Sequence, residues 1–144
     1  MSPYVLLIED DENAIELTRR AFVQQGRFEV VAFQRGREAL DFLRCRGPYQ
    51  ERAPQDPALI ILDLGLPDLP GLEILAELKS DEALRVVPVV VLTVSDQPGD
   101  QAAAAERGAN FFVRKPLRHE EFETTVELIG TFWSRVASTP GRPA

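Results

Sequence analysis

Short apolar runs alternate with segments of helical periodicity along this chain, and this alternation restricts its fold more than any other feature. Within each run the apolar residues follow one another directly instead of occupying every second position. Such continuous runs are typical of strands that are buried on both faces of a parallel sheet. We therefore predict strands over 4–8, 28–33, 58–62, 86–92 and 110–113.

The segments between these runs carry apolar residues at helical spacing. The first of them follows two aspartates and ends at Gly26, the usual order of signals that start and stop a helix. The segment 46–57 is different, because it is polar and contains three prolines, so we predict a loop there. The predicted helices span 12–25, 38–45, 72–79, 98–108 and 118–137.

Five strand–helix units predict a single α/β domain, a (βα)5 arrangement with a five-stranded parallel sheet covered by helices on both faces. A length of 144 residues suits one domain of this kind. We place the domain at 1–137, with an extended last helix, and interpret 138–144 as a frayed C-terminal tail.

The overall charge and the cysteine content exclude several classes of function. A formal charge of −7 argues against binding to nucleic acid or to an anionic membrane surface. Cys45 is the only cysteine, which rules out an internal disulfide and a zinc site built from several thiolates. Neither a signal peptide nor a membrane-spanning apolar stretch is evident, so we expect a cytoplasmic protein.

Polar residues stand where the predicted strands end. Glu9 and Asp10 follow the first strand, Asp63 the third and Thr93 the fourth, and the fifth runs toward Lys115. Because the carboxyl ends of parallel strands share one edge, where ligands of such sheets bind, these side chains should converge. Carboxylates that close together repel one another unless a cation lies among them, and oxygen ligands favour Mg²⁺, with Mn²⁺ as an alternative.

Each of these residues can be given a chemical role. Asp63, on a rigid strand end, can attack phosphorus and form an acyl phosphate. Asp10 would bind the metal ion directly and Glu9 through water, while the carbonyl group of Gly65 can supply a further ligand. Lys115 would neutralise charge on the phosphoryl group, and Thr93 can donate a hydrogen bond to it.

Taken singly, the same residues have common structural roles. Asp10 could cap the first helix, Asp63 could begin a turn, and Thr93 is a β-branched residue at the end of a strand. Lys115 alone would be read as a solvated charge. These separate explanations do not account for the position of all four residues at the ends of predicted strands.

Residues 4–136 resemble the response-regulator receiver family, on four motifs: Ile8-Glu9-Asp10, Leu62-Asp63 with Pro67 and Gly71, Leu92-Thr93, and Phe112 to Pro116. The resemblance implies a flavodoxin-like, doubly wound sheet with strand order 2-1-3-4-5. It also implies that a sensor histidine kinase donates the phosphoryl group to Asp63. Thr93 and Phe112 would then rearrange together as a switch that alters the face formed by the fourth helix, fifth strand and last helix, and Lys115–Pro116 would be a cis peptide.

Within that family the chain looks most like the stand-alone regulators that pair with bacterial and cyanobacterial phytochrome kinases. The features are Glu9 where aspartate is more usual, the long loop with Gly47-Pro48-Tyr49, the run 92–96 and the late aromatic pair Phe132-Trp133. Three positions depart from the family pattern, one of them Val94, which is bulkier than the small residue that many receivers carry after the threonine. Gly65 lacks the polar side chain often found there, and Phe112 lacks the hydroxyl group of the tyrosine seen in some relatives.

The predicted last helix is longer than a strand needs for cover, since twenty residues span about 30 Å and a strand about 17–20 Å. Its end carries apolar residues that the domain would leave exposed, which usually marks an interface. We predict a homodimer through this helix, with Leu128, Phe132 and Trp133 in the interface.

Two other functions stay open. A phosphatase or phosphotransferase with an aspartyl nucleophile would need a second acid near Asp63 and a cap over the substrate, but position 65 is glycine. A pseudo-receiver that binds partners without phosphorylation would not need Asp10, Asp63, Thr93 and Lys115 together. We therefore expect no enzyme beyond catalysis of its own phosphorylation and dephosphorylation. The cognate kinase, the downstream partner, the lifetime of the acyl phosphate and the dimer geometry are not encoded in recognisable residues.

Overall fold

The computed structural model describes residues 2–94 and 97–136, with only the backbone described at Val136. The predicted tail, 138–144, and the domain boundary at residue 137 lie outside these ranges. The described elements are β1 (Tyr4–Ile8), α1 (Glu12–Gln25), β2 (Glu29–Phe33), α2 (Gly36–Arg44), the 3₁₀ helix η1 (Gly47–Tyr49), β3 (Leu59–Leu62), α3 (Gly71–Ser80), β4 (Val89–Thr93), α4 (Pro98–Glu106), β5 (Phe111–Arg114) and α5 (His119–Val136).

The five strands form one sheet in the order β2-β1-β3-β4-β5, and every neighbouring pair is parallel. This confirms the predicted flavodoxin-like order. The chain runs outward from β1 to β2 and then crosses back to β3, so the order reverses between β1 and β3. In open sheets of this type, the crevice beyond the carboxyl ends of the strands at that reversal is where ligands bind.

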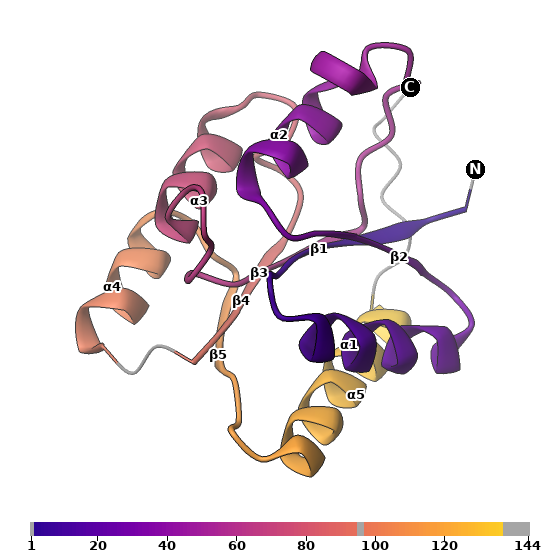
Figure 1. Cartoon of the computed structure of the whole chain (residues 1–144), viewed down its shortest axis with the longest axis vertical. Helices are drawn as coiled ribbons and strands as arrows, with labels where there is room; N and C mark the ends of the chain where they lie inside the picture. The colour runs from indigo at the N-terminus through magenta and orange to yellow at the C-terminus, as the bar shows by residue number, and fades with distance from the viewer. Residues whose placement is uncertain (1, 95–96, 137–144) are drawn as a thin grey trace.

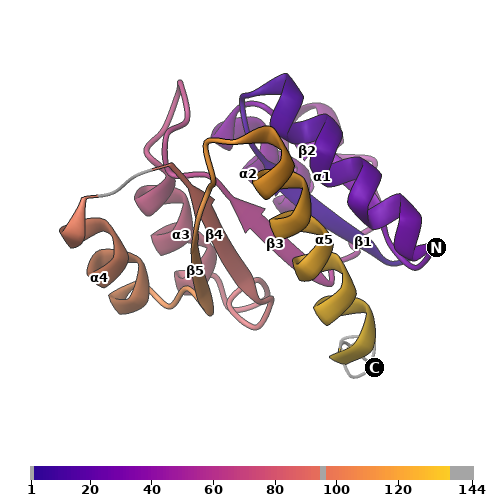
Figure 2. The same ribbon diagram turned by 90° about the horizontal axis from the view of Figure 1, so that it is seen from below.

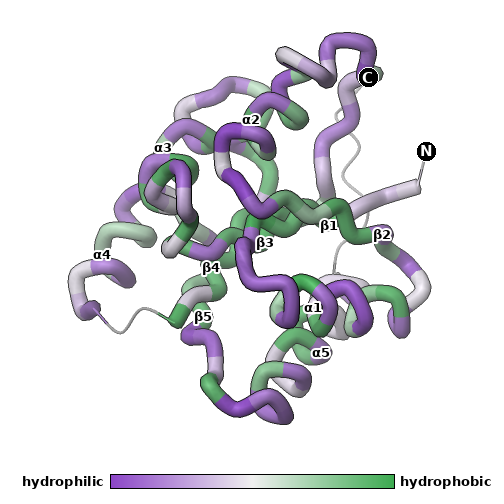
Figure 3. Tube along the Cα trace, viewed as in Figure 1, coloured by the Kyte–Doolittle hydropathy of each residue, from purple (hydrophilic) through white to green (hydrophobic). Residues whose placement is uncertain are grey.

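Helices cover both faces of the sheet, with α1 and α5 on one face and α2, α3 and α4 on the other (Figure 1; Figure 2). Side chains of β1 alternate between the two cores. Val5 and Leu7 belong to the cluster under α1 and α5, whereas Leu6 and Ile8 belong to the cluster under the other helices. Hydrophobic residues therefore follow one another along the central strands, whereas hydrophobic and hydrophilic residues alternate along the helices (Figure 3). None of the described helices is long and apolar enough to cross a membrane.

The structure corrects several predicted boundaries. β4 begins at Val89, later than predicted, because Val86 is 72% exposed and Pro88 has no N–H for a sheet hydrogen bond. The loop predicted over 46–57 contains the short helix η1. Helix α4 ends at Glu106.

The far end of α5 differs from the prediction. Trp133 is buried (7% exposed), and its Nε1 donates a hydrogen bond to the carbonyl of Ala58, just before β3. It lies on the same helical stripe as Phe122 and Val126, and the chain leading into β3 extends the surface that this stripe covers. The expected exposure of Trp133 was therefore wrong, whereas Leu128 (66%) and Phe132 (49%) are exposed.

Helix α2 is capped by a residue from another part of the chain. Arg35, at its N-cap position, makes no side-chain capping bond. Instead Asp68, in the loop after β3, accepts hydrogen bonds from the backbone N–H groups of Gly36 (2.9 Å) and Arg37 (3.0 Å), one on each carboxylate oxygen. A carboxylate here pairs N–H groups that have no partner within the helix and interacts favourably with the helix dipole. No pattern in the sequence predicted this cap.

We predict that Asp68→Ala lowers the free energy of unfolding by about 1 kcal/mol, the usual cost of losing an N-cap. Asp68→Asn should cost less, since its side chain keeps one acceptor oxygen where the carboxylate has two. Urea denaturation at neutral pH measures both values. Wild-type stability in Asp68→Ala would show that the cap is dispensable.

The same contact predicts a pH dependence. Burial alone would raise the pKa of Asp68, but the hydrogen bonds from the α2 backbone hold it below its usual value. The contribution of this carboxylate is therefore complete above its unfolded pKa of about 3.9 and is lost as the pH falls through the lower folded value. The stability difference between wild type and Asp68→Asn should shrink in that acid range, and a constant difference would contradict this.

Candidate functional site

The carboxyl ends of four strands bring four polar side chains into one buried cluster. Glu9 directly follows β1, Asp63 follows β3, Thr93 ends β4 and Lys115 follows β5. All four are at most 9% exposed, which is unusual for charged side chains unless they are paired. These residues thus converge at one edge of the sheet, as predicted. They lie at the carboxyl ends of β1, β3, β4 and β5.

Lys115 joins the two buried carboxylates. Its backbone N–H donates to the carbonyl of Thr93 (2.6 Å), which fixes the start of its side chain beside β4. Its Nζ then reaches across the strand ends to donate hydrogen bonds to Glu9 Oε1 and, at 3.3 Å, to Asp63 Oδ2. Lys115 was predicted to neutralise a phosphoryl group, whereas its pairing with Glu9 was not predicted.

This environment shifts the pKa of each group. Burial raises the pKa of Glu9 to about 7, despite its hydrogen bond with Lys115. Burial would also raise the pKa of Asp63, but the Lys115 ammonium and several hydrogen bonds outweigh it and hold that pKa below its usual value. Burial would lower the pKa of Lys115, yet its two carboxylate partners raise it. At neutral pH Asp63 is therefore an ionised carboxylate beside a cation.

The acidic residues fit a divalent metal ion. Carboxylate oxygens of Glu9, Asp10 and Asp63 lie within 4.8 Å of one another, close enough to share one ion. Asp10 is exposed, so the ion would be reached from solvent on that side. Three carboxylate donors suit a hard cation such as Mg²⁺ or Mn²⁺, and their mutual repulsion favours its binding.

The loop after Asp63 is packed closely against the carboxylate. The backbone N–H of Gly65 donates to Asp63 Oδ1 at 3.2 Å. Gly71 approaches the backbone of this loop so closely that an added Cβ would lie 2.6 Å from the Asp63 carbonyl oxygen and 2.5 Å from Leu64 Cα. A side chain at Gly71 would therefore push the loop away from its present position. At Gly65 an added Cβ would meet nothing within 4 Å, so the space beside the carboxylate is open.

The remaining predicted residues have mixed outcomes. Thr93 is buried (1%) and contributes a hydrogen bond that lowers the pKa of Asp63. Phe112 is half-buried against the cluster of α2, α3 and α4. The predicted cis peptide between Lys115 and Pro116 is wrong, because that bond is trans. The trans form is the more stable one for most bonds preceding proline.

Family comparison agrees with this geometry. A model of the response regulator receiver domain matches residues 5–127. The chain belongs to the response regulator receiver family. The receiver is 36% identical over 141 residues to the probable methanogenesis regulatory protein FilR2 of Methanothrix harundinacea, covering 96% of this chain and 89% of that protein. Its match to response regulator Rcp1 of Synechocystis is 34% identical over 137 residues, covering 94% of this chain and 92% of Rcp1.

Two solved structures are similar to the receiver over nearly its whole length. The Mn²⁺-bound form of Rcp1 has a TM-score of 0.90 at 31% identity, covering 96% of this chain and 99% of that one. The phosphorylated cyanobacterial phytochrome response regulator RcpA has a TM-score of 0.89 at 34% identity, covering 98% and 100%. The predicted resemblance to phytochrome response regulators is thereby confirmed.

We predict that Asp10→Asn weakens Mn²⁺ binding by at least about tenfold, since even residues that only support a metal ligand commonly cost that much. Titration calorimetry with Mn²⁺ measures the effect. Asp11→Asn is a matched control. It removes the same charge from the next residue, and asparagine can still cap α1 as Asp11 does through its bond from Asn13 N (3.1 Å). Equal weakening by both variants would indicate a general charge effect instead of a direct ligand.

Proposed function

We propose that this receiver accepts a phosphoryl group on Asp63 from a phosphohistidine of a sensor histidine kinase, with Mg²⁺ bound by Glu9, Asp10 and Asp63. The observation that carries the proposal is the buried, ionised Asp63 carboxylate held beside Lys115 at the edge of the acidic cluster. The predicted carbonyl ligand from Gly65 belongs to the same proposal. The expected cytoplasmic location also stays a prediction.

The transfer exchanges one bond to phosphorus for another. An Asp63 oxygen forms the P–O bond of the acyl phosphate while the P–N bond to the donor histidine breaks, and the departing imidazole takes up a proton. The lowered pKa of Asp63 supports this step, because only the ionised carboxylate is a nucleophile. Asp63 loses its negative charge when the acyl phosphate forms. Lys115, which pairs with Asp63 beforehand, lies within reach to pair with a phosphoryl oxygen instead. A bound Mg²⁺ would neutralise further charge on the phosphoryl oxygens.

Access for a donor is available beside Lys115. A hollow of about 250 Å³ lies between the start of α1 and the loop before α5, with Val94, Lys115 and Leu117 in its lining. Leu117 is 91% exposed and would form an apolar contact for a docking protein. We propose that the receiver catalyses only its own phosphorylation and dephosphorylation, since position 65 is a glycine and has no side chain that could act there as an acid on other substrates.

The signal would pass from Thr93 to Phe112 and then to the surface formed by α4, β5 and α5. Thr93 lies next to Asp63 and pairs with Arg114 of β5 in the sheet. Phe112 lies two residues before Arg114 on the same strand. Among the described residues of α4, only Ala104 is buried. A helix that buries so little apolar area can shift at low cost, which supports a change at this surface.

We predict that wild-type protein gains one phosphoryl group from acetyl phosphate when Mg²⁺ is present and that Asp63→Asn does not. Phosphate-affinity gels and intact mass would follow the product, with and without EDTA. Asp11→Asn serves again as the control, and it should be phosphorylated like wild type. Modification of Asp63→Asn to the same extent would place the acceptor elsewhere.

The same assay separates the alternatives. Steady turnover of a phosphomonoester would favour an aspartyl-nucleophile phosphatase. A folded protein that binds Mg²⁺ but never gains mass from acetyl phosphate or a histidine kinase would favour a pseudo-receiver that only binds partners.

We propose a phytochrome-type kinase as the donor. The support is similarity to Rcp1 and to RcpA, the latter being a phytochrome response regulator by its description. FilR2, at comparable identity, is described as regulating methanogenesis, so the resemblance of the fold does not by itself fix the kinase.

We also propose a homodimer through α5. Leu128 and Phe132 remain exposed, and Phe132 lies edge-on to Phe111 of β5, with 6.1 Å between ring centroids. Phe111 is itself 49% exposed and was not foreseen as part of this surface. The three side chains border an apolar groove of about 230 Å³ with Trp133 as part of its lining. Exposed apolar area of this kind supports a protein interface.

We predict that Phe132→Glu raises the dimer dissociation constant at least about tenfold, because it places a charge at the centre of an apolar contact. Sedimentation velocity of the unphosphorylated and phosphorylated protein measures it. Val23→Glu is the control, since Val23 is 64% exposed on α1 and is not part of the groove lining. A wild type that is monomeric in both states would rule out the dimer.

A further inference from the structure

The edge strand β2 presents backbone groups that have no neighbouring strand. In the sheet, β2 pairs only with β1. Glu29 N donates to Pro3 O, and Phe33 O accepts from Glu9 N, so these two residues point their backbone groups toward β1. Because the direction alternates along a strand, Val30 and Ala32 point theirs away from it. Arg19 confirms this direction, since its Nη1 donates to Val30 O at 2.9 Å from the outer side.

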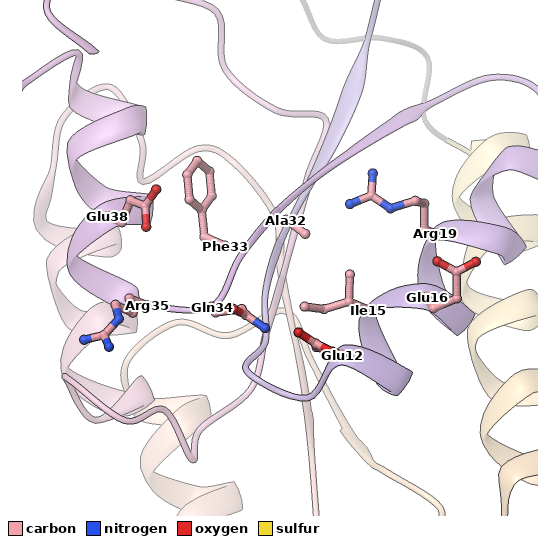
Figure 4. Close-up of a pocket in the computed structure, with 9 residues that line it drawn as sticks. All are labelled: Glu12, Ile15, Glu16, Arg19, Ala32, Phe33, Gln34, Arg35 and Glu38. Carbon is pink, nitrogen blue, oxygen red and sulfur yellow. The ribbon is translucent and has the colours of Figure 1, made fainter. Parts of the chain in front are cut away.

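A groove of about 490 Å³ lies along this edge, between α1 and α2. Figure 4 shows Ala32 in the middle of it, with Ile15 and Glu12 projecting from the α1 side and Phe33 and Glu38 on the side toward α2. Arg19 occupies the end at Val30, so the backbone edge is covered there and accessible at Ala32. The groove thus combines a free strand edge with a partly apolar base.

The charges of the groove favour a basic occupant. Glu12 and Glu16 on α1 and Glu38 on α2 place carboxylates on both walls. Arg19 and Arg35 keep their charge, Arg19 beside the neutral Val30 carbonyl and Arg35 near the Asp68 carboxylate, and Glu16 lies 3.9 Å from Arg20, so the three carboxylates outweigh the cations only slightly. Glu12 and Glu38 still place one carboxylate on each wall, so a segment bearing lysine would meet unlike charge on both sides.

We propose that the groove between α1 and α2 binds an extended, basic peptide segment of a partner protein, which adds to the sheet as a strand beside β2. Backbone hydrogen bonds at Ala32 would provide much of the affinity, and alternate side chains would reach Ile15 on one side and the glutamates on the other. The added strand would begin at Ala32, because Arg19 occupies the outer side of β2 at Val30.

The groove is physically connected to the acidic cluster. Gln34, the residue after β2, donates from Nε2 to the carbonyl of Asp10 at 3.4 Å. A peptide strand that extends past Ala32 would contact Gln34 directly. If the peptide changes the affinity for metal at Asp10, bound metal changes the affinity for the peptide by the same factor.

The proposal can be tested with the intact, isotopically labelled protein and a short capped peptide in which valine alternates with lysine. NMR titration should shift the Ala32 amide and slow its exchange with solvent. The same peptide carrying N-methyl groups on alternate backbone nitrogens keeps its charges but cannot pair as a strand. We expect it to bind at least tenfold more weakly. Equal binding of both peptides, or shifts confined to Leu128 and Phe132, would overturn the proposal.

A pair of protein variants tests the role of charge. Glu12→Gln combined with Glu38→Gln should weaken binding of the lysine peptide about three- to thirtyfold, given the usual strength of exposed ion pairs. Glu51→Gln combined with Glu82→Gln removes the same charge from exposed positions outside the groove and should leave affinity unchanged. Identical affinities for the two double variants would refute charge recognition in the groove.

Discussion

The arrangement of the site depends on one buried ammonium group placed between two buried carboxylates. Each of these charges would be costly to bury alone, by several kcal/mol even after relaxation, and the contacts of Lys115 with Glu9 and Asp63 offset that cost. Because the three residues follow β1, β3 and β5, the same contacts join strand ends that are not all neighbours in the sheet. The charge cluster therefore sets both the chemistry of Asp63 and the relative positions of the strand ends.

The sheet in turn explains why an acid could be activated here without unusual backbone geometry. Parallel strands deliver their last side chains to one edge, and the reversal of order between β1 and β3 leaves room there. Gly71 keeps the following loop against the backbone of Asp63, while a side chain added at Gly65 would meet nothing within 4 Å. Close packing on one side and open space on the other distinguish a position for chemistry from a merely buried charge.

Sequence patterns predicted the strands well because doubly buried strands leave continuous apolar runs. The predicted site residues lie where those runs stop. Features that depend on three-dimensional contact were not predictable in this way. Trp133 looked exposed because helix length was compared with strand length alone, although the chain before β3 adds cover at Ala58. Val86 looked like strand because its apolarity is real, but Pro88 delays pairing. The capping of α2 by Asp68 joins positions far apart in sequence and left no periodic signal.

The loop that carries Asp68 is fixed at both ends, at Asp63 by the packing of Gly71 and at α2 by the two hydrogen bonds that start the helix. It therefore connects the nucleophile, Asp63, with the start of helix α2. A displacement of the Asp63 backbone would first change the hydrogen bonds of the Gly36 and Arg37 amide groups, before any distant helix moved. The exchange rates of those two amides would thus be a sensitive reporter of the chemical state of Asp63.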